Sequence, residues 1–377
     1  MICEHFGRCG GCTYLDIPYE QELKIKLHSL KETLGGSTLE TIHPSPIKEG
    51  YRNKMELAFG DEGKEGQLAV GMRKRRSFYE VATPTNCVLI PKDFKKIITH
   101  VLEFFRNSNE TFFHRKRHTG SLRHLILRRG EFTGEILVGL SVTSSLEADL
   151  NPLIKSLTTL TLTGELKGIM KIVNDGVADA VKNEKTTILW GQDYYTEKIC
   201  NLTFNVSMFS FFQTNSSAAE VLYKIVQEYA EQSKLAYDLY CGTGTITQII
   251  SPKFNQVIGI EIIEDAIKAA KANAKLNNIT NCTFHTGDVL TTLDTTETPN
   301  TIIVDPPRDG LHPKTLSKII EISPEFIIYV ACKPASLARD LVTLTKANYT
   351  LKNLEAVDMF PRTPHVECIA LVCKSEN

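Results

Sequence analysis

The sequence predicts an α/β fold in which a doubly wound domain with a parallel sheet follows a smaller α+β domain. Two patterns lead to this prediction. Apolar strands alternate with helical segments from about residue 195 onward, and short strands separated by turn residues occupy the stretch from about 51 to 181. We therefore expect three parts, an N-terminal cysteine cluster with a helix (1–45), a central α+β domain (46–190) and the doubly wound domain (191–377).

The composition is that of a globular protein with more than one domain. The chain has 377 residues, of which 42% are hydrophobic and 23% are charged, and its formal net charge is -1. Because the overall field is close to neutral, binding to nucleic acid would need a local basic patch. The chain shows no signal sequence and no apolar run long enough to cross a membrane, so we expect a cytoplasmic monomer that does not bind membranes.

The N-terminal segment carries cysteines at the spacing C-x5-C-x2-C. Cys3, Cys9 and Cys12 form this cluster, and the next cysteine is Cys87. Without an export signal, such thiols indicate metal binding or catalysis rather than a disulfide framework. Four thiolates can ligate zinc or an iron-sulfur cluster, and the spacing alone does not decide between them. A helix is predicted over 18–34, with leucines on one face and two glycines after its end.

The central domain is predicted to contain strands at 55–60, 67–72, 122–130, 134–142 and 168–175 and a helix at about 91–105. Two of its stretches are basic. Residues 73–76 are followed by Phe78 and Tyr79, and residues 114–129 contain six Arg or Lys and no acidic residue. Basic side chains among aromatic ones can contact phosphates and stack on unpaired bases, so this domain is predicted to bind RNA. A solvated strand face is the alternative.

Three successive strand ends of the last domain predict a nucleoside site. The first strand runs into a turn with Gly242 and Gly244, the second ends in Glu261, and the third ends at Asp288. These residue types suit close backbone approach, ribose hydroxyls and an adenine amino group. The third glycine of the dinucleotide fingerprint is missing, since Thr247 takes its place. S-adenosylmethionine therefore fits this site better than NAD.

The fourth and fifth strand ends carry the candidate reacting groups. Asp305 begins the motif DPPRDG, in which no aromatic residue follows the prolines, so methylation of an exocyclic base amine is disfavoured. Cys332 follows the fifth strand, and Lys333 and a helix-starting proline come after it. A thiol at a helix N-terminus beside a lysine is expected to have a lowered pKa. The alternative is a buried cysteine at a strand end. Glu367 stands just before the last strand.

A nucleophilic thiol, a carboxylate and a methyl donor suit the methylation of uracil at C5. This carbon is too weakly nucleophilic to attack a sulfonium methyl group unaided. Addition of a thiolate at C6 turns C5 into an enolate carbon, and a base must then remove the C5 proton before the thiol is eliminated. We assign Cys332 as the nucleophile and Glu367 as the base.

Six ordered motifs resemble those of the RNA uracil-C5 methyltransferases, over essentially the whole chain. They are SFFQTN (210–215), DLYCGTGTI (238–246), GIE (259–261), DPPRDG (305–310), the Cys332 segment and HVE (365–367). The resemblance implies a Rossmann-like, S-adenosylmethionine-dependent methyltransferase domain. It also implies that the cofactor is bound by Gln213, Tyr240, Gly242, Gly244, Thr245, Glu261, Asp288 and Asp305, the last of these lying between donor and uracil.

The chain departs from the family at one of these motifs and at one position shortly before another. The family commonly has Ser-Cys-Asn-Pro where this chain has Ala-Cys332-Lys333-Pro, and a histidine where Arg362 stands. These changes bear on the rate more than on the type of reaction.

The resemblance also extends to the cysteines. Members of the family that act on ribosomal RNA carry a [4Fe-4S] cluster on three close cysteines and a distant one, which implies Cys3, Cys9, Cys12 and Cys87 as ligands here. It implies 23S ribosomal RNA as the substrate. Such relatives often begin with a small β-barrel RNA-binding domain, which we expect to be missing because the cysteines start at residue 3.

Two other functions remain open at this point. One is methylation of the T-loop uridine of transfer RNA, because archaeal enzymes with that target share the architecture. The other is a metal-stabilised RNA-binding protein with an inactive transferase domain. The joint presence of Gln213, Asp305, Cys332 and Glu367 argues against the second.

Overall fold

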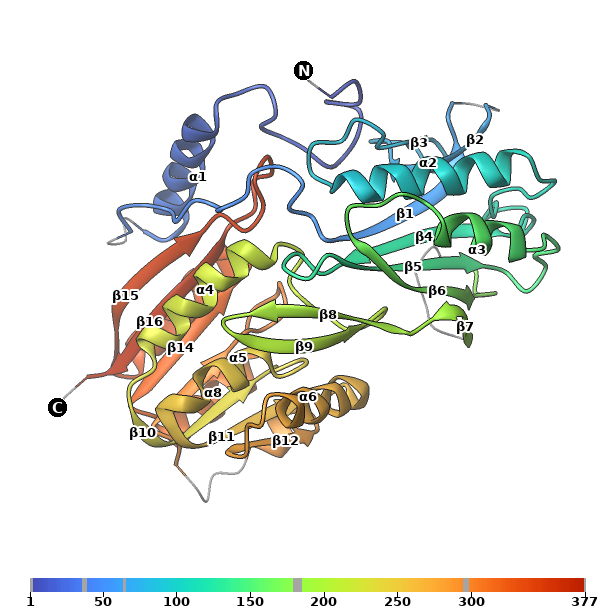
Figure 1. The fold of residues 1–377 in the computed structure, drawn as a ribbon. Coiled ribbons are helices and arrows are strands. Elements are labelled where there is room, and N and C mark those ends of the chain that lie inside the picture. The colour runs from blue at the N-terminus through green and yellow to red at the C-terminus, as the bar shows by residue number, and fades with distance from the viewer. Residues whose placement is uncertain (1–2, 36–38, 64–65, 179–184, 294–297, 376–377) are drawn as a thin grey trace.

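The computed structural model describes residues 3–35, 39–63, 66–178, 185–293 and 298–375, and contains two seven-stranded sheets and a two-stranded one (Figure 1). The large sheets lie at opposite ends of the molecule, and the small one lies between them. Among the described residues, no helix is long and apolar enough to cross a membrane.

The C-terminal sheet confirms the predicted doubly wound fold. Its strand order is β12-β11-β10-β13-β14-β16-β15. The strands are β10 (Ser233–Leu239), β11 (Phe254–Glu261), β12 (Cys282–Thr286), β13 (Thr301–Val304), β14 (Phe326–Ala331), β15 (Tyr349–Val357) and β16 (Glu367–Lys374). β10 to β14 run parallel, whereas β16 is antiparallel to β14 and β15. The order reverses between β10 and β13, which places a crevice at the carboxyl ends of these strands.

Helices cover both faces of this sheet. They are α4 (Ser216–Tyr229), α5 (Thr245–Ile250), η1 (Ser251–Lys253), α6 (Glu264–Leu276), α7 (Val289–Thr292), α8 (Pro313–Ile322) and α9 (Pro334–Lys346). In β10, Ala236 packs in the cluster that contains α4 and α5, while Tyr237 packs in the cluster that contains α8 and α9. Successive strand side chains point to opposite faces, so an apolar strand of this kind is buried on both sides.

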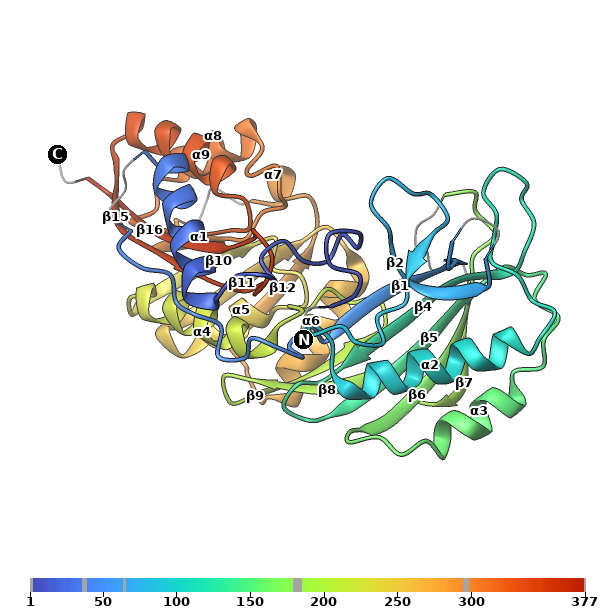
Figure 2. The same cartoon turned by 90° about the horizontal axis from the view of Figure 1, so that it is seen from above.

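The central sheet has the order β3-β2-β1-β4-β5-β6-β7 and is antiparallel except for the parallel pair β5 and β6. Its strands are β1 (Lys54–Asp61), β2 (Leu68–Arg73), β3 (Val81–Ala82), β4 (Leu122–Arg129), β5 (Glu135–Val142), β6 (Glu165–Val173) and β7 (Lys185–Gly191). The helices α2 (Lys92–Arg106) and α3 (Asn151–Thr158) lie along this sheet (Figure 2). Phe94, Ile97 and Val101 of α2 are fully buried against it, because they share one helix face.

Five elements differ from the sequence-based expectation. β3, β7 and α3 were not predicted, since β3 is very short, β7 is largely exposed and α3 spans only two turns. The stretch from residue 195 was expected to open the parallel sheet, but β8 (Tyr194–Ile199) and β9 (Leu202–Ser207) form an antiparallel hairpin. The threonine-rich run 291–301 lies between two strands and predicts a loop. Its first two residues belong to α7, and 294–297 lie outside the described residues.

The predicted N-terminal helix is present as α1 (Tyr19–Thr33). It packs beside α9 at the doubly wound domain, where Leu30 joins the core (Figure 2). The cysteine segment that precedes it lies instead against the central sheet, since Cys9 forms an antiparallel β-bridge with Lys74. The N-terminal part of the chain thus contacts both large domains.

Candidate active site

A cavity of about 1230 Å³ opens at the carboxyl ends of β10, β11, β13 and β14. Most small-molecule pockets have roughly 300–1,000 Å³, so this one has room for a nucleoside cofactor and part of a second substrate. The predicted site residues that line it are Gln213, Tyr240, Gly242, Thr245, Glu261, Asp305, Cys332 and Glu367. Gly244 and Asp288 are not part of this lining.

The glycine turn after β10 forms one wall of the cavity. Tyr240, Gly242 and Gly244 all have positive φ angles, of 63°, 54° and 72°. A Cβ atom on Gly244 would lie 2.6 Å from the ring of Phe284, so this glycine permits close packing of the turn. A Cβ atom on Gly242 would meet no protein atom within 4 Å, which leaves that side of the turn open to a ligand.

The carboxylate of Glu261 ties the end of β11 to the glycine turn. It accepts hydrogen bonds from the backbone nitrogens of Gly242 at 3.2 Å and Ile263 at 3.0 Å. A carboxylate has about four lone-pair sites, so two remain for the hydroxyl groups of a ribose. Ile262 and Ile263 are 64% and 60% exposed and line the cavity beside this carboxylate. They were not among the predicted site residues, although two consecutive apolar residues directly after a strand-end acid are a sequence signal for an apolar wall beside a polar ligand group.

Asp288 follows β12, as predicted, but its side chain does not line the cavity. Its carboxylate accepts a hydrogen bond of 2.7 Å from the backbone nitrogen of Leu290 and so caps α7. The side chain is exposed, and its negative charge is among the causes, after burial, of the raised pKa of Tyr240. Asp288 therefore lies near the cofactor side of the cavity without lining it.

Gln213 is held by the segment that joins β9 to α4. Asn215 caps α4 by accepting from the backbone nitrogen of Ala218 at 3.1 Å, and it donates to the carbonyl of Met359 at 2.9 Å. This fixed segment brings Gln213 and Phe211 to the cavity. Phe211 is 69% exposed there, and its aromatic ring was not singled out from the motif SFFQTN.

Strand pairing brings the proposed nucleophile and base together. Ala331 at the end of β14 lies opposite Cys368 in β16, so Cys332 and Glu367 extend this antiparallel pair at the cavity. Asp305 enters from the end of the neighbouring strand β13. Three groups that are distant in the sequence therefore meet at one edge of the sheet.

The prediction of a lowered pKa for Cys332 is wrong for the ligand-free chain. Burial raises the pKa of this thiol, and the negative charges of Glu367 and Asp305 raise it further. The positive charge of Arg308, which also lines the cavity, acts in the opposite direction. The helix start and Lys333 do not outweigh the burial and the two carboxylates.

The two carboxyl groups have raised pKa values. Burial raises the pKa of Glu367 well above its usual range, and the charge of Asp305 adds to this effect. Burial alone raises the pKa of Asp305 to about 7. The carboxyl group of Asp305 can therefore exchange a proton near neutral pH, and the raised pKa of Glu367 makes its ionised form a stronger base than an exposed carboxylate.

The four predicted cysteine ligands line a second, smaller cavity of about 40 Å³ between the N-terminal segment and the central sheet. Burial, followed by the charges of Cys87 and the other two thiols, raises the pKa of Cys12 to about 12. The described residues contain no group of three or more His, Cys, Asp or Glu arranged to hold a metal ion. The thiols thus share one cavity without the geometry of a single-ion site.

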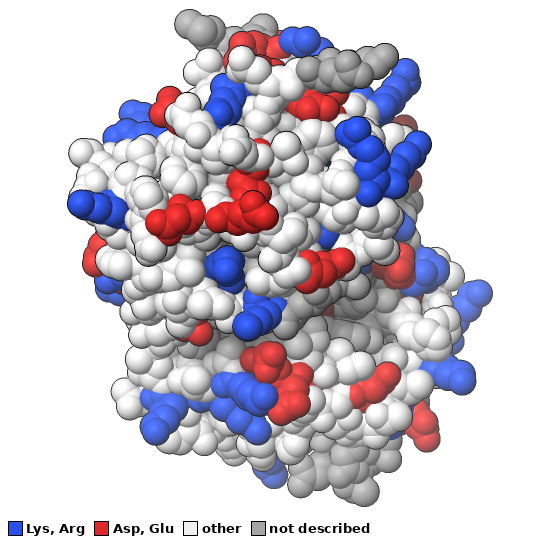
Figure 3. All heavy atoms as spheres, turned by 90° about the vertical axis from the view of Figure 1, so that its right-hand side faces the viewer, with Lys and Arg blue, Asp and Glu red and all other residues white. Residues whose placement is uncertain are grey.

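The basic stretch 114–129 of the central domain contains both buried and exposed basic side chains. Arg123 and Arg128 are 3% and 0% exposed, and both donate to backbone carbonyls, Arg128 to that of Ser207 at 2.8 Å. These two arginines are structural, which corrects their inclusion in an RNA-binding patch. Lys116 and Arg117 are exposed. In the face shown in Figure 3, Lys and Arg are interspersed with Asp and Glu.

The chain is similar to known RNA methyltransferases. Residues 164–286 match the family model tRNA (Uracil-5-)-methyltransferase, and residues 232–370 match a methyltransferase domain. An uncharacterized RNA methyltransferase of Clostridium acetobutylicum is 44% identical over 98% of this chain and 83% of its own length. One from Caldanaerobacter subterraneus is 41% identical over 99% of this chain and 84% of its own length.

A solved structure resembles the chain over nearly its full length. It is the tRNA (uracil-54, C5)-methyltransferase of Pyrococcus abyssi in complex with S-adenosyl-L-homocysteine. The TM-score is 0.81 and the sequence identity is 29%, with 97% of this chain and 86% of that chain covered.

Proposed function

Since the chain belongs to the RNA (uracil-5-)-methyltransferase family, we propose that it methylates uridine C5 in 23S ribosomal RNA through a covalent adduct between Cys332 and C6 of the base. The observation that carries this proposal is the convergence of Cys332, Glu367 and Asp305 in one cavity beside the glycine turn.

The residues of the cavity can carry out the bond formation and the proton transfer that this reaction requires. The Cys332 thiolate forms a bond to C6, which makes C5 a nucleophile, and Arg308 favours the thiolate against the two nearby carboxylates. Once C5 carries the transferred methyl group, Glu367 accepts the C5 proton, and the electron pair of that C–H bond re-forms the C5–C6 double bond and expels the Cys332 thiolate from C6. The raised pKa of Glu367 makes it a strong enough base for this proton.

S-adenosylmethionine, when bound, supplies the methyl group. The open side of Gly242, the free lone pairs of Glu261 and the exposed apolar pair Ile262 and Ile263 fit a nucleoside cofactor in this part of the cavity. Gln213, Tyr240 and Thr245 are the other residues proposed to bind it, and Gly244 shapes the turn.

Cys3, Cys9, Cys12 and Cys87 are proposed to hold a [4Fe-4S] cluster. Support comes from the four thiols that line one otherwise mainly apolar cavity. A cubane cluster binds each thiolate to a different iron, so its ligands are spread more widely than those of one metal ion. Anaerobically purified protein is expected to contain about four irons per chain. Stoichiometric zinc without iron would contradict the cluster and leave the methylation proposal intact.

Ribosomal RNA is proposed on the basis of these cysteines, because they resemble those of the ribosomal branch of the family. Transfer RNA is the second candidate, and the similarity to the Pyrococcus abyssi enzyme favours it. Both substrates would meet the same cavity, so the catalytic groups do not discriminate between them.

The substrate is tested by mapping 5-methyluridine in the RNA of a strain that lacks the gene. We expect the modification to be lost from 23S ribosomal RNA, to return with the wild-type gene and to stay absent with a Cys332→Ala gene. Loss from transfer RNA alone would establish the second candidate. Modification that returns with the Cys332→Ala gene would refute the covalent mechanism.

A further inference from the structure

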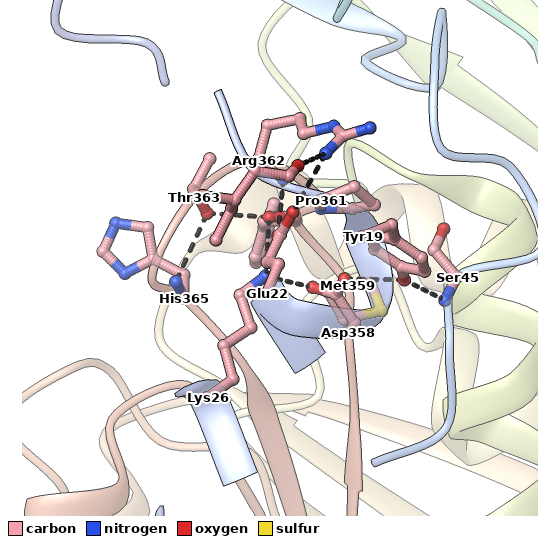
Figure 4. Close-up of polar contacts among 12 residues, drawn as sticks. Tyr19, Glu22, Lys26, Ser45, Asp358, Met359, Pro361, Arg362, Thr363 and His365 are labelled. Carbon is pink, nitrogen blue, oxygen red and sulfur yellow. Dashed lines mark hydrogen bonds and ion pairs between the residues drawn. The ribbon is translucent and has the colours of Figure 1, made fainter. Parts of the chain in front are cut away.

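A buried ion cluster joins α1 to the loop between β15 and β16, residues 358–366 (Figure 4). Glu22 and Asp358 are 0% exposed, and Lys26 is 2% exposed. Burying such charges is costly, and apolar side chains of similar size often stabilise a fold as well as a buried ion pair does. Stability alone therefore does not explain why these charges are buried. The contacts of the cluster with this loop suggest that it positions the loop.

Lys26 has an acceptor for each of its three protons. Its Nζ donates to Oε1 of Glu22 at 2.7 Å, to Oδ1 of Asp358 at 2.7 Å and to the carbonyl of Phe360 at 3.4 Å. The hydroxyl of Tyr19 donates to the other carboxylate oxygen of Asp358 at 2.8 Å. About two turns of α1, from Tyr19 to Lys26, thus fix both the side chain of Asp358 and the backbone at Phe360.

A second connection holds the loop two residues further on. The backbone nitrogen of Arg362 donates to Oε1 of Glu22 at 2.7 Å, and its Nη1 donates to the carbonyl of Ile17 at 3.1 Å. Arg362 has a φ angle of 71°, in the left-handed region that non-glycine residues seldom adopt. Its carbonyl accepts from the backbone nitrogen of Thr13 at 2.7 Å. These bonds over-determine the unusual backbone at this residue.

The loop held in this way forms a wall of the active-site cavity. Phe360 and His365 both line the cavity, and their rings meet edge to face with centroids 6.3 Å apart. The Phe360 carbonyl is the one that accepts from Lys26, so the same residue connects the ion cluster to the cavity wall. The loop then leads into Glu367, which is already held by its pairing with Val357.

We propose that Lys26 is a positioning residue for methyl transfer, which through Asp358 and Phe360 fixes the Phe360–His365 wall against which the uracil is oriented toward Cys332 and Glu367. The inference rests on the proposed roles of Cys332 and Glu367. A displacement of about 1 Å in such a wall can slow a reaction by roughly 100-fold, because it spoils the alignment of the reacting atoms. Affinity for RNA, which phosphate contacts dominate, should change little.

The test compares Lys26→Met with the triple variant Glu22→Gln, Lys26→Met, Asp358→Asn, which removes the three buried charges together. In this variant the partly exposed Arg362 loses its 3.6 Å ion pair with Glu22. The methyl acceptor is ribosomal and transfer RNA from the deletion strain, and kcat and KM are measured per folded chain, with thermal unfolding recorded in parallel. We expect kcat to fall about 10- to 100-fold, with KM for RNA and S-adenosylmethionine within about 3-fold of wild type. If Lys26 had a purely structural role, the variants would unfold at a lower temperature, but kcat per folded chain would not fall while KM stayed the same.

A wild-type kcat in either folded variant would overturn the inference. If neither variant folds, Tyr19→Phe decides, because it keeps every charge and removes only the hydroxyl that donates to Asp358 and accepts from the backbone nitrogen of Ser45. Its kcat is expected to be several-fold lower, and an unchanged value would overturn the inference. Lack of methylation by the wild-type protein would instead refute the proposed function.

Discussion

The glycine turn after β10 offers a matched pair of substitutions, one that should disturb folding and one that should disturb cofactor binding. In Gly244→Ala the new Cβ would lie 2.6 Å and 2.9 Å from two atoms of the Phe284 ring and 3.0 Å from Cβ of Ala270. A left-handed backbone costs a residue other than glycine about 1–2 kcal/mol, and overpacking a core costs about 1–3 kcal/mol. The expected loss of unfolding free energy is therefore about 2–5 kcal/mol.

Gly242→Ala is the control, since it has the same change in chemistry at a φ angle of 54° but meets no protein atom within 4 Å. Only the backbone cost of about 1–2 kcal/mol is expected. Because Gly242 lines the cavity, its new methyl group takes space from the cofactor, and S-adenosylmethionine affinity should fall at least tenfold.

Urea unfolding monitored by circular dichroism gives the two stabilities, and titration calorimetry with S-adenosylmethionine gives the two affinities. The reasoning is refuted if Gly244→Ala is as stable as Gly242→Ala, or if Gly242→Ala binds the cofactor as tightly as wild type does.

Three further predictions concern catalysis, RNA binding and pH. Glu367→Gln should stop proton removal and slow turnover by about 10²–10⁴-fold, so that methylated RNA remains attached to Cys332 on a denaturing gel. Alanine at Lys116 and Arg117 should weaken RNA binding and reduce the logarithmic salt slope by roughly 0.7–0.9 for each lost phosphate contact. Glu131→Gln should stabilise the fold above pH 7 but not at pH 4, because burial and a neighbouring carboxylate raise the pKa of Glu131 from 4.5 to about 7.

The sign of the pH effect follows from linkage. A carboxyl group whose pKa is higher in the folded state contributes stability that is complete below its unfolded pKa and is lost as the pH rises through the folded value. Equal stability of Glu131→Gln and wild type at pH 8 would contradict this prediction.

The other two predictions have their own controls. On the denaturing gel, the band of RNA attached to Glu367→Gln protein should vanish in the double variant that also carries Cys332→Ala. For RNA binding, the control is Lys346→Ala at the end of α9. An unchanged salt slope in the variant with alanine at Lys116 and Arg117 would show that these two residues do not contact RNA.

The strongly patterned parts of the molecule could be predicted from the sequence. The parallel strands are long apolar runs, α2 has one apolar face, and the residues at strand ends meet because parallel strands share one carboxyl edge. The order of the motifs along the chain therefore predicted that Gly242, Glu261 and Cys332 line one cavity.

What escaped prediction depends on three-dimensional surroundings. The pKa of Cys332 is set by carboxylates that arrive from other strands, and no local signal reports them. The burial of Arg123 and Arg128 depends on carbonyl groups of residues about 50 and 80 positions away. The ion cluster of Lys26 joins groups more than 300 positions apart, so it cannot be read from local pattern.

The position of β16 in the sheet has a consequence for folding during translation. β16 is inserted between β14 and β15, so the strand that bears Glu367 lies inside the sheet although it is translated after all the others. A nascent chain that has emerged only as far as β15 exposes Cys332 next to an unfilled gap in the sheet. Insertion of β16 closes that gap and brings Glu367 beside Cys332 in a single event, so the proposed base joins the proposed nucleophile only when the hydrophobic sheet becomes continuous.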